Sequence, residues 1–270
     1  MYKLVALDLD GTLFNSCSEI SPANLQAVHD LADAGIMTVI SSGRPYEVVR
    51  AVLEKLDLLR KDYFSIVCNG SRVVNNYSGE ELFSYTMTGD LVAELGYLAD
   101  STKCFIHGFS VSRGLLMNQE NPYSSVECFN GLIPFQLQNF REVKSEEAFY
   151  KVLLCAEKSH LDEVISALSP DFYERFKIIR SLDFLLEFLS PQAGKGAALL
   201  SMGRRFGIDP GEMMAFGDQE NDLDMLSVVG MPVAMGNASD YIKDQAGFVT
   251  LTNDEDGVSY GIRRLILDRL

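Results

Sequence analysis

Short apolar runs alternate with amphipathic segments over the first 70 residues. Leu4–Leu7, 36–40 and 64–68 are almost wholly apolar, which predicts buried strands. The stretches between them carry apolar residues at helical spacing, which predicts helices over about 22–34 and 45–56. This alternation of strands and helices predicts a parallel sheet with right-handed crossovers.

The same alternation of strands and helices returns near the C-terminus, whereas the middle of the chain has a different pattern of strands and helices. The later segments expected are helices near 196–206, 237–246 and from 256, and strands at 213–216, 231–235 and 248–250. The middle strands expected are 103–110, 114–118, 149–156 and 176–181, with helices near 89–100, 121–129 and 159–168. We therefore expect an α/β fold in which a Rossmann-like, doubly wound parallel-sheet core (1–82 and 188–270) carries an inserted α+β domain (83–187).

Composition narrows the class of protein. The chain has 270 residues, 47% of them hydrophobic, and no apolar run of about 18 residues that would predict a membrane span. Met1-Tyr2-Lys3 leads straight into a strand, so we expect no signal peptide. Five scattered cysteines without a C-x-x-C pair favour a reduced, cytoplasmic protein over a disulfide framework or a zinc site. A net charge of −15 argues against nucleic-acid partners. We expect a monomer or weak homodimer.

Acidic residues directly follow the first strand. Asp8 and Asp10 lie two residues apart, so in an extended strand their carboxylates point to the same side and repel. Three further loops at predicted strand ends or helix starts also carry polar residues. The four loops are 8–12, 42–44, 194–196 and 217–222. Ligands of open parallel sheets bind at the carboxyl ends of the strands, where these acids could share a hard, oxygen-bound cation such as Mg²⁺.

These four loops resemble the motifs of the haloacid dehalogenase superfamily. The chain has D-x-D-G-T at 8–12, a small hydroxyl residue before Gly-Arg at 42–44, a lysine at a helix start (Lys195), and G-D-x-x-N-D at 217–222. The segments 233–238 and 252–258 resemble the Cof-like IIB sugar-phosphatase branch, in which an α/β cap is inserted between the second and third motifs. Ser42 stands where most members have threonine and keeps the hydroxyl.

The resemblance implies a role for each motif residue. Asp8 would be the nucleophile, and Asp10 the general acid and base. Mg²⁺ would be held by Asp8, Asp218 and the backbone carbonyl of Asp10, with Asp222 in the outer shell. The residues expected to bind phosphate or substrate are Leu9, Ser42, Gly43, Arg44, Lys195 and Asn221. The inserted domain would recognise the leaving group of the substrate and exclude water from the active site during transfer.

The leading interpretation is an Mg²⁺-dependent phosphatase of small phosphorylated metabolites, sugar phosphates first, that acts through an aspartyl-phosphate. A phosphomutase of the same superfamily is an alternative, and it would need basic residues of the insertion to hold a second phosphate. The available basic residues are Arg113, Arg141, Lys144 and Lys151. A non-catalytic phosphometabolite-binding protein is the third possibility. The sequence argues against a nucleotide-binding P-loop, because Leu189 and Gly196 stand where glycine and Ser or Thr are required.

Overall fold

The computed structural model describes residues 1–269, which form two compact units. The core unit comprises Met1–Phe83 and the chain from Gly194 onward, and the cap unit is Ser84–Ala193. The sequence placed these junctions after residues 82 and 187. The second junction lies further along the chain because strand β12 (Leu185–Leu189) pairs with two cap strands, β10 (Ala148–Cys155) and β11 (Lys177–Leu182).

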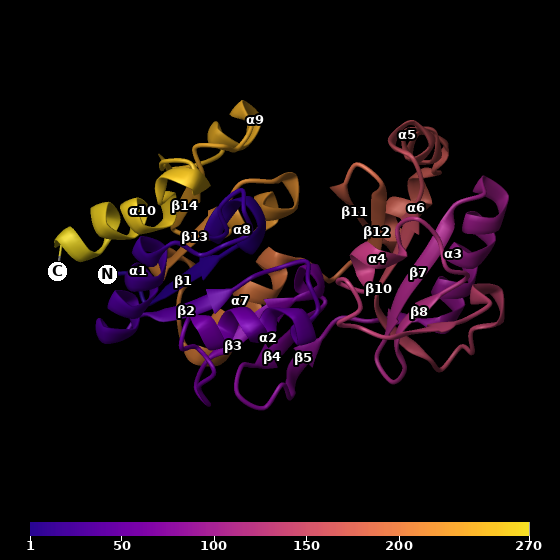
Figure 1. Cartoon of the computed structure of the whole chain (residues 1–270), viewed down its shortest axis with the longest axis horizontal. Coiled ribbons are helices and arrows are strands. Elements are labelled where there is room, and N and C mark those ends of the chain that lie inside the picture. Colours follow the sequence, from indigo (N-terminus) through magenta and orange to yellow (C-terminus); the bar gives the residue numbers. More distant parts are fainter. Residues whose placement is uncertain (270) are drawn as a thin grey trace. The chain divides into compact units, whose positions relative to one another are not determined.

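The core unit follows the expected alternation of strands and helices (Figure 1). Its first segment contains β1 (Leu4–Leu7), α1 (Pro22–Asp33), β2 (Met37–Ile40), α2 (Tyr46–Lys55), β3 (Phe64–Val67), β4 (Arg72–Asn75) and β5 (Glu81–Ser84). Its second segment contains α7 (Lys195–Phe206), β13 (Met213–Gly217), α8 (Leu223–Leu226), β14 (Met231–Ala234), α9 (Asp240–Lys243), β15 (Phe248–Val249) and α10 (Gly257–Leu265).

The parallel sheet has the order β15-β14-β13-β1-β2, so β1 pairs with strands from both segments. All four residues of β1 are fully buried, as their apolar sequence predicts. One face of the sheet packs on apolar residues of α7, α8 and α9. On the other face, α1 packs on α10, and Gly261 of α10 lies against the Phe216 ring, where a β-carbon would come within 2.6 Å. Helices on both faces make this the predicted doubly wound fold.

The third predicted strand differs from the expectation of a fully parallel sheet. β3 joins β4 and β5 in a separate antiparallel sheet, and a single parallel bridge between Ser41 and Ile66 links it to the chain beyond β2. The physical reason is the turn that follows, where Cys68, Asn69 and Gly70 all have positive φ and reverse the chain into β4.

The cap unit has its own sheet, in the order β11-β12-β10-β7-β8-β9, with β6 also paired to β10. Its elements are β6 (Met87–Thr88), α3 (Gly89–Thr102), β7 (Phe105–Ser110), β8 (Gly114–Met117), α4 (Ser124–Glu127), β9 (Phe135–Leu137), β10 (Ala148–Cys155), α5 (Lys158–Ala167), α6 (Pro170–Arg175), β11 (Lys177–Leu182) and β12. The helix expected over 121–129 is only α4, because Phe129, Asn130 and Gly131 have positive φ and end it.

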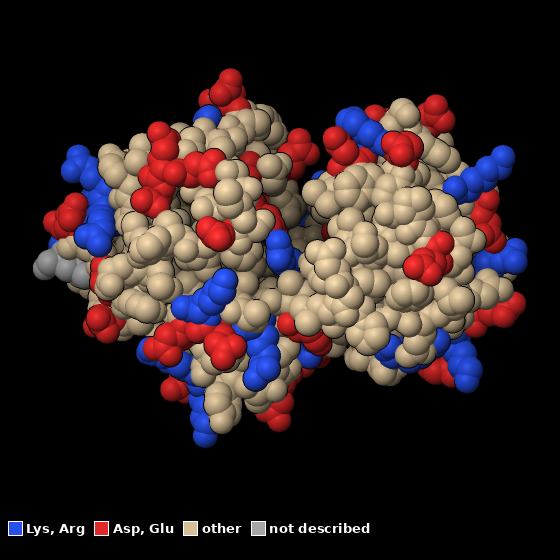
Figure 2. All heavy atoms as spheres, viewed as in Figure 1, with Lys and Arg blue, Asp and Glu red and all other residues tan. Residues whose placement is uncertain are grey.

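Charge is spread over both units. On the face shown in Figure 2, acidic and basic side chains are interspersed on each unit among uncharged residues. Within residues 1–269, no helix combines the length and the apolar character needed to cross a membrane.

Candidate active site

Loops at the carboxyl ends of β1 and β13 meet the start of α7. Lys195, the first residue of α7, places its Nζ 2.6 Å from Asp8 Oδ1 and 2.6 Å from Asp222 Oδ1. Asp8 directly follows β1, and Asp218 directly follows β13. Each of these four side chains is at least nine-tenths buried. Residues from three distant parts of the chain therefore form one buried charged cluster, which we call the core cluster (Asp8, Lys195, Asp218, Asp222).

The core cluster has more negative than positive charge, with three carboxylates around one ammonium. Burial raises the pKa of Asp8 well above its ordinary value, and Asp222 adds to this shift while Lys195 opposes it. Burial, followed by repulsion from Asp222, raises the pKa of Asp218 to about 6. Burial disfavours the charged form of Lys195, but attraction from Asp222 and Asp8 outweighs it and raises the pKa of the amine. A further cation would relieve the remaining repulsion.

A side-chain hydroxyl holds the Asp218 carboxylate, and two backbone amides hold that of Asp222. Asp218 Oδ1 accepts a hydrogen bond from Thr12 Oγ1 at 2.8 Å, and Asp222 Oδ2 accepts from the amides of Asp218 and Gln219 at 3.0 and 3.1 Å. Gly11 has φ +80°, and a β-carbon there would lie 2.3 Å from Asp218 Oδ2. Glycine is therefore required at position 11 for the two loops to approach this closely.

The donor set fits a hard divalent cation. Single carboxylate oxygens of Asp8, Asp218 and Asp222 lie within 4.8 Å of one another, and oxygen is the ligand that Mg²⁺ prefers. This grouping contains Asp222, which the sequence placed in an outer shell. The Asp10 side chain lies elsewhere, because its two oxygens accept from Arg44 Nε at 2.9 Å and from an Arg44 Nη at 2.5 Å. Coordination by the Asp10 backbone carbonyl remains a prediction.

The remaining phosphate-binding candidates gather around a residue that the sequence did not single out. Asn69 donates its amide to the Ser42 carbonyl at 3.0 Å, and its Oδ1 accepts from Asn221 Nδ2 at 3.3 Å. A β-carbon on Gly43 would lie 3.0 Å from the Asn69 side-chain amide. Ser42 is buried, and its Oγ accepts from the Arg44 amide at 3.2 Å. The Asn-Gly pair at the end of β3 was the available signal, and it resembles an ordinary turn.

Two of the residues predicted to bind phosphate or substrate, Leu9 and Arg44, make other contacts. Leu9 is fully buried, and its carbonyl accepts from the Phe14 amide at 2.8 Å. Arg44, besides its ion pair with Asp10, has its guanidinium carbon 5.3 Å from the centre of the Phe14 ring. Asp10 is exposed and Arg44 is half-buried, whereas Asp8, two residues before Asp10, is buried.

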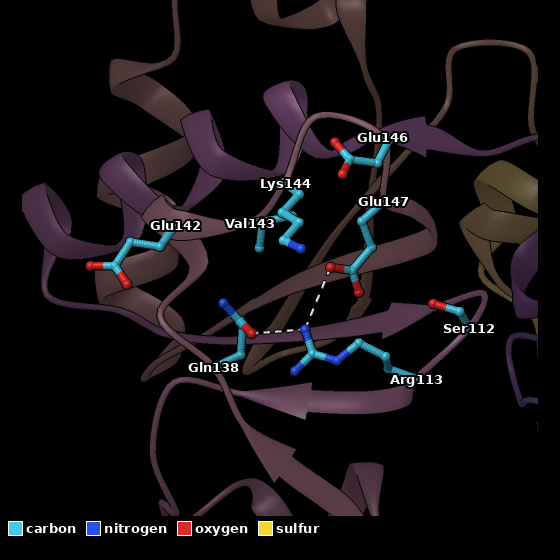
Figure 3. Close-up of a pocket in the computed structure, with 8 residues that line it drawn as sticks. All are labelled: Ser112, Arg113, Gln138, Glu142, Val143, Lys144, Glu146 and Glu147. Atoms are coloured by element: carbon cyan, nitrogen blue, oxygen red, sulfur yellow. Dashed lines mark hydrogen bonds and ion pairs between the residues drawn. The ribbon is translucent and has the colours of Figure 1, made fainter.

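The cap unit contains a cavity of about 400 Å³ (Figure 3). Its lining includes Arg113 and Lys144, two of the four basic residues considered for a second phosphate, together with Glu142, Glu146 and Glu147. An Nη of Arg113 is already bonded to Gln138 and paired with Glu147 (Figure 3). The other two basic residues are engaged elsewhere, since Arg141 pairs with Asp100 at 3.1 Å and Lys151 with Glu187 at 3.3 Å. The four basic residues therefore do not form one anion site.

Comparison with known proteins agrees with these observations. The family model of haloacid dehalogenase-like hydrolases matches residues 5–262. The Bacillus subtilis protein named "Putative phosphatase YxeH" is 31% identical over 268 residues and covers 99% of both chains. A second relative from that organism, 5-amino-6-(5-phospho-D-ribitylamino)uracil phosphatase YwtE, is 30% identical over 283 residues and covers 98% of each chain.

A solved structure has the same fold. The crystal structure of a haloacid dehalogenase-like hydrolase from Bacteroides thetaiotaomicron is similar with a TM-score of 0.85 and 30% identity, over 98% of this chain and 100% of that one. The predicted fold class and the resemblance drawn from the four motifs are thereby confirmed. The chain belongs to the haloacid dehalogenase-like hydrolases, and within them it is a phosphoric monoester hydrolase.

Proposed function

We propose that this protein is an Mg²⁺-dependent phosphatase of small phosphorylated metabolites, sugar phosphates first, that acts through an aspartyl-phosphate on Asp8. The observation that carries the proposal is the core cluster, in which a buried carboxylate at a strand end is held by Lys195 beside two further buried carboxylates. Phosphoryl transfer depends mainly on in-line positioning and on neutralisation of the phosphate oxygens, and these residues are suited to both tasks.

Asp8 would be the nucleophile. The Lys195 ammonium contacts Asp8 Oδ1, which orients the carboxylate and leaves its second oxygen for attack on phosphorus. Ser42, Gly43 and Asn221, which meet around Asn69, would bind the phosphate oxygens through hydroxyl and amide donors. Mg²⁺ held by Asp8, Asp218 and the Asp10 carbonyl would supply further positive charge to those oxygens.

Asp10 would move the protons of both steps. In the first step, the bond from Asp8 to phosphorus forms, the bond to the leaving oxygen breaks, and Asp10 gives that oxygen its proton. In the second step, Asp10 takes a proton from water as the water attacks phosphorus, and the bond to Asp8 breaks, releasing phosphate. Because its carboxylate pairs with Arg44 in this structure, Asp10 has to exchange that partner for the substrate during turnover.

We assign recognition of the leaving group to the cap unit. The core residues described above address phosphate or metal, and the cap unit is the remaining large element of the chain. Hydrolysis is favoured over mutase activity because three glutamates accompany the two basic residues of the cap cavity, and a second phosphate would meet net negative charge there.

A phosphate-release screen tests the proposal. The panel includes sugar phosphates, nucleotides, cofactor phosphates and 5-amino-6-(5-phospho-D-ribitylamino)uracil, each with Mg²⁺ and with a chelator, and Asp8→Asn is the matched control. We expect release from at least one metabolite that requires Mg²⁺ and is absent in the variant. Phosphate that accumulates only when a sugar bisphosphate is added would identify a mutase. No release from any compound, with substrate binding retained, would favour the non-catalytic alternative.

A further inference from the structure

Two asparagines outside the four motifs contact the loop that carries Asp8 and Asp10. Asn237, in the loop after β14, donates from Nδ2 to the Gly11 carbonyl at 2.8 Å. Asn253, in the loop after β15, donates from Nδ2 to the Phe14 carbonyl at 3.0 Å. Each side chain thus supplies a donor to a carbonyl of the turn Leu9–Leu13 or of the residue that follows it.

The two asparagines are linked to each other. The Asn253 amide donates to Asn237 Oδ1 at 3.0 Å, and the neighbouring Asp254 accepts from the Ser16 amide through Oδ1 at 2.8 Å. The loops that carry them are tied together by the bond from the Gly236 amide to the Leu251 carbonyl at 2.9 Å. We call Asn237, Asn253 and Asp254 the bracket, since together they hold the chain at both ends of the segment 11–16.

The turn needs support from outside because its own geometry is irregular. Inside the π turn Leu9–Leu13, Asp10 has ψ 113° and Gly11 has φ +80°, both non-helical. Backbone bonds that close the turn run from the Leu13 amide to the Asp8 carbonyl at 3.3 Å and from the Phe14 amide to the Leu9 carbonyl at 2.8 Å. The Asp10 carbonyl, expected to bind metal, is one peptide unit away from the carbonyl that Asn237 holds.

We propose that Asn237 and Asn253 are positioning residues of the phosphatase reaction. By holding the peptide groups of Gly11 and Phe14, they fix the direction of the Asp10 carbonyl and of the Asp10 side chain while touching neither substrate nor reacting atoms. This inference rests on the proposed function for its catalytic meaning. Outer residues that orient ligands typically change metal affinity or activity by about 10–100-fold when they are removed.

The test compares Asn237→Ala and Asn253→Ala with Asn75→Ala as the matched control. The Asn75 side chain also bonds to backbone groups, but it lies at the end of β4 and not beside the Leu9–Leu13 turn. Its Nδ2 donates to the Lys61 carbonyl at 2.6 Å, and its Oδ1 accepts from the Tyr77 amide at 3.1 Å. We expect Asn237→Ala to lower kcat and to weaken Mg²⁺ binding in calorimetry, each by about 10–100-fold. The KM for substrate should stay within about twofold, because Ser42, Gly43 and Asn221, which would bind the phosphate oxygens, lie on other loops. The control should match the wild type in all three quantities.

Asn253→Ala should lower kcat and Mg²⁺ affinity less than Asn237→Ala does, because the bond from the backbone amide of residue 253 to Asn237 Oδ1 survives. In the double variant, each of these two quantities should fall by less than the product of the two single effects. Amide exchange of Leu13 and Phe14 should speed up in both variants. This readout and the Mg²⁺ affinity need no turnover, so a wild type that releases no phosphate would refute the proposed function and leave the bracket testable. Unchanged kcat, Mg²⁺ affinity and amide exchange, with only a lower melting temperature, would overturn the inference and make the asparagines purely structural. If Asn237→Ala does not fold, Asn253→Ala decides between these results.

Discussion

Each unit of the molecule buries a lysine among carboxylates, and the two sites differ in where the charges lie. In the core cluster, three aspartates and Lys195 come from loops or a helix start beyond the strand ends, and two of the contacts are 2.6 Å. In the cap unit, Lys151 of β10 lies 3.3 Å from Glu187 of β12 and 3.7 Å from Glu127 of α4. We call these three residues the cap cluster.

The contrast separates a reactive arrangement from a structural one. The Lys151 ammonium lies 5.2 Å from the centre of the Phe109 ring and two glutamates share it, so packing on the cap sheet itself balances most of its charge. The core cluster keeps a larger excess of negative charge on oxygens at the open end of a parallel sheet, where ligands bind. Burial of charge therefore does not identify an active site without position and charge balance.

The largest effect expected is the loss of activity in Asp8→Asn. The change removes the nucleophile and one metal ligand with almost no change of shape, so phosphate release should fall by more than about 10³-fold. The melting temperature should stay the same or rise, because burial and Asp222 both disfavour the Asp8 charge. Steady-state kinetics and thermal unfolding measure the two quantities. Activity at a substantial fraction of the wild-type rate would exclude the covalent mechanism.

Asp10→Asn should have the next largest effect. Losing the general acid and base slows both chemical steps by about 10²–10⁴-fold, while Mg²⁺ still binds because the expected ligand is the backbone carbonyl. Calorimetric titration with Mg²⁺ and single-turnover kinetics test this division of labour. Lost metal affinity combined with a normal rate at saturating Mg²⁺ would contradict it.

Lys151→Met tests the structural side of the comparison. It leaves Glu127 and Glu187 buried without their cation, which should lower the free energy of unfolding by about 3–5 kcal/mol. Hydrolysis of a generic aryl phosphate should be unchanged at a temperature where the variant is folded. Adding Glu127→Gln and Glu187→Gln should restore much of the stability. A loss of aryl-phosphate hydrolysis as large as that of Asp8→Asn would show that the cap cluster takes part in the chemistry.

The smallest effect expected is a pH dependence of stability from His107. Burial lowers the pKa of His107 to about 4, which the hydrogen bond with Asn121 opposes and Lys151 reinforces. The unfolded chain takes up this proton near pH 6.5 and the folded chain only near pH 4, so stability falls as the pH drops through that window, by up to about 3 kcal/mol. Urea unfolding at pH 7 and pH 4.5 should show a smaller difference in His107→Gln. An equal difference in both proteins would remove His107 as the cause.

The sequence was sufficient for features that depend on local pattern and on the geometry of parallel sheets. The apolar runs of β1, β2 and β13 and the polar residues after them were predictable, because parallel strands end at one edge and bring those residues together. β12 was not, because its five buried residues include the charged Glu187, and it lies between the preceding strand β11 and the more distant β10. The β3–β4 hairpin was missed because its left-handed turn involves Cys68 and Asn69, residues that adopt this conformation without any run of glycines.

The candidate site, like the fold, could be predicted only where it depends on local sequence pattern. Asp8, Lys195 and Asp218 stood out because unusual residues recur at strand ends, whereas Asn69 looked like an ordinary turn residue. The pairing of Asp10 with Arg44 joins residues 34 positions apart and depends on side-chain directions that sequence spacing does not encode. The segments that carry the bracket stood out by their resemblance to the Cof-like branch, but its contacts did not, since Asn237 and Asn253 reach Gly11 and Phe14 only after the sheet has brought their loops together.

The pairing of β1 between β2 and β13 also has a consequence for how the protein is made in the cell. Leu4 is synthesised before the cap unit, but its partner Met213 is added only after the whole cap unit has been synthesised. At about 5–20 residues per second, the most apolar strand of the core waits about 10–40 s for its neighbour. During that time the nascent chain exposes one edge of β1 and contains two of the five strands of the parallel sheet. The strand order therefore leaves an unpaired apolar strand edge open to aggregation in this interval, and slower translation of the cap segment would lengthen it.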